Sequence, residues 1–299
     1  MDVVLPMPGT YIVAVSGGVD SRVLLDILYK QTKPDTHSYI VAHLDHGIRD
    51  DSSLDHSFVK QLAKNYQLPF EAKKVALGNS ASEERARIER YTFLQDVQRA
   101  HNASAVITAH HQDDVLETAI LNMLRGTGRK GLTSLQSSDQ LLRPFLAVPK
   151  SELTAYAIKN NLKWREDSTN SDDMYLRNYV RNNLIPRIDT DSKEQLIALL
   201  RNLRLTNKEL DTLLVNQIVE QGQSGTLNRQ WFNSLPHAVA KEMMASWLRL
   251  HNVRDFDSKT IERLVVAAKS GRYGQVFPTH GKSVMRVGKE NLALELAER

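Results

Sequence analysis

The first 160 residues alternate short apolar runs with longer amphipathic stretches, and this alternation restricts the fold more than any other feature of the sequence. The apolar runs are rich in β-branched residues, which is typical of buried strands. We expect strands at 10–15, 39–44, 70–75, 106–109 and 141–146, and helices at 22–31, 52–66, 82–100, 113–125 and 151–160. Strands that alternate with helices of this length predict βαβ units on a parallel sheet, with ligands at the carboxyl ends of the strands.

The alternation stops near Pro186, and a different pattern follows. A long helical stretch is expected at 192–221, then two helices at 237–251 and 258–269, and a hairpin through Gly281 and Gly288. The sequence therefore predicts an α/β domain over 1–188, a helical linker over 189–222 and a small α+β C-terminal domain over 223–299.

The loop after the first strand has the sequence SGGVDS and leads directly into a helix. Its glycines allow a ligand to approach the backbone, and its amides together with the helix N-terminus form a cradle for an anion. The loop differs from GxxxxGK[ST] because it has no lysine, so other cations or Mg²⁺ must neutralise a bound pyrophosphate. The residues of this candidate site are Ser16, Gly17, Gly18, Val19, Asp20 and Ser21.

Two further polar clusters follow strands of the same sheet. The segment HLDHGIR after the second strand contains Asp45 and His46, and the segment HHQDDVLET after the fourth begins with His110 and His111. In the second segment, Asp113, Asp114 and Glu117 are spaced so that Glu117 shares a helix face with each aspartate. Three carboxylates in this arrangement can hold Mg²⁺ or a substrate ammonium group.

Positive charge is concentrated in one part of the chain. The net charge is +4, but residues 125–187 carry eleven Lys and Arg against six acids, a net charge of +5. A basic stretch of this kind is a candidate surface for the phosphates of a nucleic acid. The residues predicted to make these contacts are Arg125, Arg129, Lys130, Arg165, Arg177 and Arg181.

Composition excludes several classes of protein. The 299 residues include no cysteine, which rules out disulfides, thiolate metal sites and cysteine nucleophiles. No apolar run approaches the roughly 20 residues that a membrane-spanning helix needs, and the N-terminus does not resemble a secretory signal. We therefore expect a cytoplasmic protein without a membrane association or an obligate protein partner.

Seven motifs in order give the chain a family resemblance: SGGVDS, HLDHGIR, ARIERY, HHQDDVLET, RGTGRKGL, WREDSTN and RNYVRNNLIP. SGGVDS resembles the signature of the N-type ATP pyrophosphatases, the PP-loop superfamily, and the whole series resembles the tRNA(Ile)-lysidine synthetases within it. The last ~75 residues resemble that family only in size and helical character, and its members often carry a further C-terminal domain.

The resemblance implies a Rossmann-like catalytic domain and a specific reaction. ATP, with Mg²⁺, adenylates the wobble cytidine of a tRNA(Ile) with a CAU anticodon, and free L-lysine displaces AMP to form lysidine. It implies that Ser16–Ser21 bind ATP and that Asp113, Asp114 and Glu117 lie around lysine or Mg²⁺, Asp113 and Asp114 being the candidate Mg²⁺ ligands. Asp45, His46 and His111 are unranked candidates for the base, and the small C-terminal domain is expected to contact tRNA.

Three alternatives belong to other functional classes. A tRNA thiolase would use cysteine chemistry, which the cysteine-free sequence argues against. An ammonia-using amide synthetase agrees with the composition but does not explain the basic stretch. A nucleotide-gated RNA-binding module without catalysis is the third, and formation of AMP and pyrophosphate with tRNA and lysine distinguishes it from an enzyme.

Overall fold

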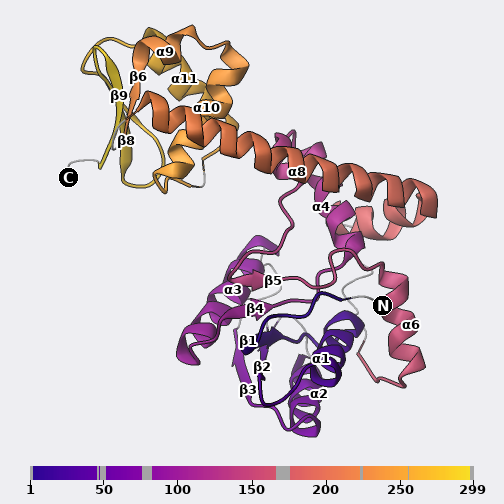
Figure 1. Cartoon of the computed structure of the whole chain (residues 1–299). Helices are drawn as coiled ribbons and strands as arrows, with labels where there is room; N and C mark the ends of the chain where they lie inside the picture. The colour runs from indigo at the N-terminus through magenta and orange to yellow at the C-terminus, as the bar shows by residue number, and fades with distance from the viewer. Residues whose placement is uncertain are drawn as a thin grey trace. The chain divides into compact units, whose positions relative to one another are not determined.

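The computed structural model describes residues 3–45, 47, 52–75, 83–165, 176–222, 225–254 and 256–296 (Figure 1). The chain divides into two compact units, Met1–Arg201 and Asn202–Arg299. The division falls inside the longest helix, α8 (Thr190–Gln221), so the predicted boundaries at 188 and 222 remain a prediction.

The first unit contains a parallel five-stranded sheet in the order β3-β2-β1-β4-β5. The strands are β1 (Gly9–Ala14), β2 (His37–Asp45), β3 (Phe70–Lys74), β4 (Ala105–Ile107) and β5 (Leu141–Leu142). The chain builds outward from β1 to β3 and then returns to place β4 on the other side of β1. The order reverses between β1 and β4, and the carboxyl edge at such a point is where open α/β sheets bind ligands.

Helices cover both faces of this sheet, and the two-residue period of β1 assigns each face its core. Tyr11 and Val13 pack in a cluster with α1 (Val19–Gln31), α2 (Ser52–Asn65) and α6 (Lys150–Lys159). Ile12, between them, packs in a second cluster with α3 (Glu83–Ala100). The remaining helical elements of the unit lie between β4 and α8: α4 (Gln112–Leu124), α5 (Arg129–Leu132), α7 (Leu176–Tyr179), the π-helical turn η2 (Val180–Leu184) and η3 (Ile185–Arg187).

The predicted parallel α/β architecture is confirmed, with local differences. The fifth strand ends at Leu142 rather than at 146, because Pro144 has no amide hydrogen for a ladder and the chain turns there to bury Phe145. Part of the glycine-containing segment 125–132 forms the short helix α5, which begins after Gly128. The π-helical turn η2 was not predicted, and it packs Val180 against Leu116 of α4.

The second unit is an α+β structure, as predicted, but it has more strands than a hairpin. Its elements are β6 (Thr226–Asn228), α9 (Arg229–Ser234), α10 (His237–Leu250), α11 (Ser258–Ser270), β7 (Val276–Pro278), β8 (Ser283–Val287) and β9 (Asn291–Leu296). The strands form an antiparallel sheet in the order β6-β9-β8-β7. Its core surrounds the fully buried Trp247 and includes Leu214 and Ile218 of α8. No helix in the described parts of either unit is long and apolar enough to cross a membrane.

The packing of α6 gives a direct test of the first core. Leu153 is fully buried against the sheet, whereas Ile158 on the same helix is 63% exposed. Leu153→Ala should lower the free energy of unfolding by about 3 kcal/mol, because it removes buried surface and leaves a cavity. Ile158→Ala should change it by roughly 0.5 kcal/mol or less. Urea denaturation of both variants measures the difference, and equal losses would contradict this placement of α6.

Candidate active site

The SGGVDS loop joins β1 to α1 at the reversal of strand order. Gly17 has a φ of +96°, a conformation that a residue with a side chain adopts only with strain. Gly18 is the N-cap of α1 with an ordinary φ of −70°, and a Cβ placed on it would meet only Ser16 Oγ within 4 Å, at 3.5 Å. The first glycine is therefore needed by the backbone, while the second leaves open space beside the helix N-terminus.

Hydrogen bonds between its two serines hold the loop in shape. Ser21 Oγ donates to the Gly18 carbonyl at 3.0 Å and accepts from the Ser16 amide at 3.2 Å. Because the Ser21 hydroxyl proton is already used, Ser16 Oγ donates in the 3.2 Å contact between the two hydroxyls. The first-turn amides of α1 have no acceptors within the helix, so this end of α1 is suited to an anion.

Two basic residues far along the chain also reach this loop. The Lys150 ammonium, at the start of α6, lies 2.6 Å from both carboxylate oxygens of Asp20. The Arg165 amide donates to the Gly17 carbonyl at 3.0 Å, and its guanidinium pairs with Asp55 of α2. Arg165, predicted to contact tRNA, thus lies beside the loop. Lys150 was counted only as part of the basic stretch, and no local signal connects it to Asp20.

The end of β2 contributes Asp45 and its neighbour His43. Asp45 is buried, and its carboxylate accepts from the Gly47 amide at 2.8 Å and lies 4.0 Å from Lys74 Nζ. His43 donates from Nδ1 to the Val15 carbonyl at 2.8 Å, and burial holds the pKa of His43 below its usual value. His43 therefore supports the end of β1, while Asp45 lies at the carboxyl edge. His46, the other predicted candidate from this segment, lies outside the described residues.

The end of β4 places two histidines between the loop and α4. His111 is buried, and its Nε2 lies 3.7 Å from Asp20 and 3.5 Å from Asp114. His110 Nδ1 lies 2.9 Å from the Thr108 hydroxyl. Burial lowers the pKa of His110 to about 4, and the positive charges of Arg143, Arg87 and Arg90 add to the lowering. His110 is therefore neutral at pH 7, in surroundings that favour negative charge.

The predicted acids of α4 are largely paired with arginines. Glu117 is only 1% exposed and binds Arg177 and Arg181, with Arg181 Nε at 2.8 Å. Arg181 Nη2 also lies 2.9 Å from Asp114. Burial opposes the ionisation of Asp114, but His111, whose amide also donates to the carboxylate at 2.9 Å, and Arg181 hold the pKa of this carboxyl below its usual value. Both arginines, predicted to contact tRNA, thus lie against residues predicted to hold lysine.

Asp113 differs from these two acids. In the described residues its carboxylate has no hydrogen bond or ion pair, although it lies in the same first turn of α4. No group of three metal-binding side chains occurs in the parts of the chain that the structure describes. In the described residues, the carboxylates of the site are therefore separate from one another and do not form a complete set of metal ligands.

A group of basic and aromatic side chains also borders the end of β4. The Arg87 guanidinium lies 4.8 Å from the centre of the Tyr91 ring, and Arg143 Nη2 lies 3.4 Å from the Tyr91 hydroxyl. Tyr91 thus links the ARIERY helix to the residue that follows β5. Arg87 and Arg90 are three residues apart on α3 and share a helix face, whereas Arg143 reaches this group from a segment about 50 residues further along the chain.

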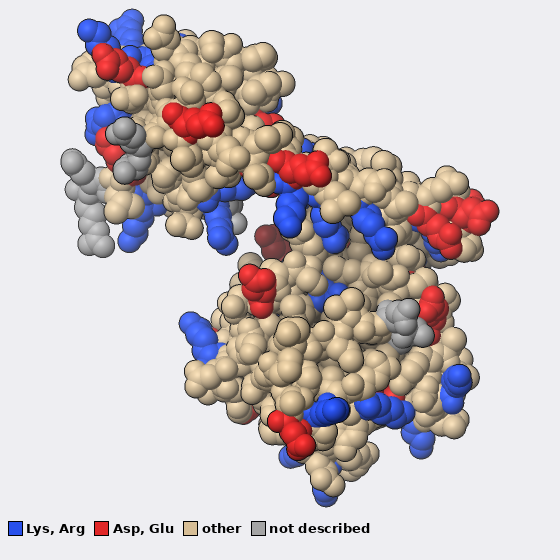
Figure 2. All heavy atoms as spheres, in the orientation of Figure 1, with Lys and Arg blue, Asp and Glu red and all other residues tan. Residues whose placement is uncertain are grey.

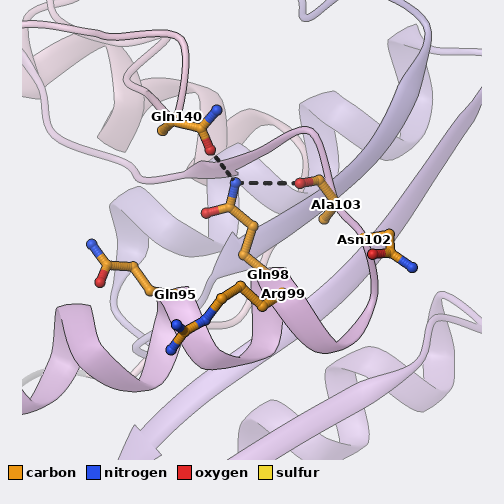
Figure 3. Close-up of a pocket in the computed structure, with 6 residues that line it drawn as sticks. All are labelled: Gln95, Gln98, Arg99, Asn102, Ala103 and Gln140. Carbon is orange, nitrogen blue, oxygen red and sulfur yellow. Dashed lines mark hydrogen bonds between the residues drawn. The ribbon is translucent and has the colours of Figure 1, made fainter.

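The other predicted basic residues lie apart from these pairs. Arg125 is exposed at the end of α4, and Arg129 and Lys130 lie on α5. Figure 2 shows basic side chains along the region of α8. In the sequence of this helix, Arg201, Arg204 and Lys208 are three and four residues apart, a spacing that places them on one helix face. An open pocket at the C-terminal end of α3, lined by Gln95, Gln98, Arg99, Asn102, Ala103 and Gln140, contains none of the predicted site residues (Figure 3).

Comparisons with known proteins agree with this geometry. Residues 7–188 match the PP-loop domain family, and the chain belongs to that family. It is 37% identical over 182 residues to the tRNA(Ile)-lysidine synthase of Thermotoga maritima, which covers 58% of this chain and 44% of the relative. It is 36% identical to the enzyme of the same name from Geobacter sulfurreducens, covering 70% of this chain and 46% of the relative.

The similarity extends into the second unit in other relatives. The tRNA(Ile)-lysidine synthase of Staphylococcus aureus is 28% identical over 271 residues, covering 84% of this chain and 63% of the relative. The chain thus spans about half the length of the curated relatives it matches. Among solved structures, a U34-tRNA thiolase from Methanococcus maripaludis shares the fold, with a TM-score of 0.53 and 18% identity over 67% of this chain and 74% of that chain.

The two glycines of the loop should respond differently to substitution. Gly17→Ala should lower the free energy of unfolding by roughly 1–2 kcal/mol because of its left-handed backbone. Gly18→Ala should leave stability nearly unchanged but weaken the binding of inorganic pyrophosphate, because the new methyl group enters the open space. Urea denaturation and calorimetric titration measure the two effects. Unchanged pyrophosphate binding by Gly18→Ala would contradict our assignment of that space.

The lowered pKa of His110 predicts a pH dependence. Between its usual value near 6.5 and the folded value of about 4, the unfolded chain binds a proton that the folded protein does not. Stability therefore falls as the pH drops through this window, by roughly 2 kcal/mol from pH 7 to pH 5. His110→Gln should remove this part of the decrease. NMR titration of the ring resonance that disappears in His110→Gln measures the pKa directly, and a midpoint near 6.5 would contradict the prediction.

Proposed function

We propose that this chain catalyses ATP-dependent formation of lysidine at the wobble cytidine of a tRNA(Ile) with a CAU anticodon. The observation that carries the proposal is the meeting of SGGVDS and HHQDDVLET at the reversal of strand order, in a chain similar to curated tRNA(Ile)-lysidine synthases. The modified cytidine pairs with A instead of G, and the tRNA is charged with isoleucine instead of methionine.

The first step takes place at the SGGVDS loop. The C2 carbonyl oxygen of the cytidine attacks the α-phosphate of ATP, and the bond to the β-phosphate breaks to release pyrophosphate. Ser16, Gly17, Gly18, Val19, Asp20 and Ser21 bind ATP, with its phosphates on the amides of the loop and of the first turn of α1. Arg87, Arg90 and Arg143 supply positive charge at the end of β4, where it stabilises the charge that develops on the phosphates.

Mg²⁺ fits this site as a partner of the phosphates. Magnesium is usually held by one or two carboxylates together with substrate phosphates and water, which suits a site whose acids are available singly. Asp113 is the most accessible candidate because it has no protein partner among the described residues, and Asp114 is the second. When bound, the ion would neutralise phosphate charge.

The second step requires lysine to approach C2 of the adenylated cytidine. Its ε-amine forms the new C–N bond, and the C–O bond to AMP breaks. Asp113, Asp114 and Glu117 attract the ammonium groups of lysine, while Arg177 and Arg181 lie beside them and suit its α-carboxylate. The ε-ammonium must first lose a proton, and Asp45, His46 and His111 are the candidate bases.

The tRNA is held mainly through its phosphates. Arg165, Arg177 and Arg181 have carboxylate partners in the free protein, so among the predicted contacts we assign a phosphate first to Arg125, which is exposed at the end of α4. The second unit and the basic residues of α8 offer further candidate phosphate contacts. Phosphate contacts position the tRNA without reading its sequence, so the anticodon is recognised at the site of the chemistry.

The decisive experiment is reconstitution with purified components. Incubation with CAU-anticodon tRNA(Ile), ATP and lysine should release AMP and pyrophosphate and increase the mass of the cytidine by that of lysine minus water, measured by mass spectrometry. Arginine and ornithine should be poor substitutes, because a site built for one ammonium spacing penalises a displaced charge. An unmodified tRNA after complete incubation would refute the proposal, and ATP binding without turnover would favour the RNA-binding alternative.

Phosphate contacts predict a salt-dependent effect of the exposed Arg125. Arg125→Gln should weaken tRNA binding and lower the slope of log affinity against log salt by about one unit, because one phosphate contact is lost. Arg99→Gln removes one exposed charge from α3 and serves as the matched control. Filter binding at several salt concentrations, with tRNA(Ile) and methionine tRNA, measures both variants. Equal slopes for Arg125→Gln and Arg99→Gln would place Arg125 outside the tRNA surface.

A further inference from the structure

Lys150 brings a positive charge to a loop that has no basic residue of its own. Its ammonium lies 2.6 Å from both oxygens of Asp20, 130 positions earlier in the chain. The helix that carries it, α6, is fixed against the first core by Leu153 and Ala157, which are both fully buried. The position of the ammonium is therefore set by a rigid element rather than by a surface loop.

The position of Lys150 on α6 is not explained by the helix itself. Lys150 is the first helical residue, after Pro149 at the N-cap. The N-terminal end of a helix carries partial positive charge, so a cation there is electrostatically unfavourable and an acid is preferred. The Asp20 carboxylate offsets this unfavourable interaction with the helix end, because it accepts hydrogen bonds from the Lys150 ammonium. The lysine is thus held at an unfavourable helix position, with its charge directed at the SGGVDS loop.

The SGGVDS loop needs such a charge if it binds the phosphates of ATP. Backbone amides contribute only partial charges, and the loop lacks the lysine that GxxxxGK[ST] loops place on the β- and γ-phosphates. The guanidinium of Arg165 is directed to Asp55 instead. Among the Lys and Arg residues that the structure describes, Lys150 is the one whose side chain forms an ion pair with the SGGVDS loop.

We propose, on the basis of the function proposed above, that Lys150 binds the β- and γ-phosphates of ATP. In the free protein Asp20 holds the ammonium, and phosphate oxygens take over this contact when ATP binds. The exchange replaces one charge-assisted hydrogen bond by another of the same kind, so the lysine remains paired in both states. A cation on these phosphates also stabilises the negative charge that develops on pyrophosphate as it leaves.

A series of ligands separates this role from a purely structural one. Calorimetric titration of the full chain with ATP, pyrophosphate, AMP and adenosine, without tRNA or lysine, compares wild type with Lys150→Met, Lys150→Arg and Lys159→Met. Lys159 lies exposed at the other end of α6 and is the matched control. Lys150→Met should weaken the binding of ATP and pyrophosphate by about 10-fold or more. Binding of AMP and adenosine should stay within about twofold, and Lys150→Arg should recover part of the loss.

The other outcomes overturn the proposal in distinguishable ways. If Lys150→Met binds ATP and pyrophosphate like wild type, or loses all four ligands equally, Lys150 is a structural link between α1 and α6. If Lys150→Met does not fold, Lys150→Arg replaces it in the same titrations. An altered affinity for ATP and pyrophosphate alone supports the contact, whereas an equal change in affinity for all four ligands refutes it. A wild-type chain that binds no ATP refutes the proposed function as well, whereas lysidine formation with unaltered ATP binding by Lys150→Met refutes this inference alone.

Discussion

The central position of β1 is the constraint on which the rest of the first unit depends. β1 pairs in parallel with β2 on one side and β4 on the other, and its Ile12 and Val13 are fully buried on opposite faces. The chain moves away from β1 in one direction and later returns to place β4 on its other side. The loops that follow β1 and β4 therefore leave neighbouring strands at the same carboxyl edge of the sheet. The SGGVDS loop and the HHQDDVLET helix therefore meet there, although about 90 residues separate them along the chain.

Charge pairing is the second organising feature of this edge. A lone carboxylate as buried as Glu117 would be costly, and two arginines compensate it. Asp114 and Asp20 are likewise matched with Arg181 and Lys150. The free site is thus close to electrically balanced, so ligands that carry both signs of charge can bind by exchanging partners. In the proposed function, lysine has this property, because it carries two ammonium groups and a carboxylate. The anionic phosphates of ATP would instead replace the Asp20 carboxylate on Lys150.

Much of the fold could be predicted from the sequence because it is encoded locally. The strands and helices of the α/β domain follow from short apolar runs and helical periodicity, and the glycine loop follows from its place between a strand and a helix. The end of β5 at Pro144, the short helix α5 and the π-helical turn were not predicted, because each depends on packing that a local pattern does not contain.

The candidate site was only partly predictable for the same physical reason. The acids of α4 and the loop residues were identified, but their partners come from distant segments: Lys150 for Asp20, and Arg177 and Arg181 for Glu117. A charge count along the chain assigned these arginines to tRNA phosphates, because it registers the amount of positive charge in a segment and not the carboxylate that each cation faces. Arg177 and Arg181 reach Glu117 because α7 and η2 pack against α4, a long-range contact that no local pattern contains.

The charge of the second unit extends this reasoning to the tRNA. Residues 226–296 carry eleven Lys and Arg against six acids, the same excess as residues 125–187. Some of these cations have internal roles: the Arg229 guanidinium donates to the carbonyls of Ala268, Gly271 and Gly288, and Arg286 pairs with Glu295. The rest leave a basic unit that has its own core around Trp247. In the proposed function, the basic segment 125–187 of the first unit and the basic second unit bind the same polyanion, and the second contact becomes intramolecular once the first has formed. Each unit can then bind phosphates weakly while the whole chain binds tRNA tightly, and this leaves the anticodon free to enter and leave the active site.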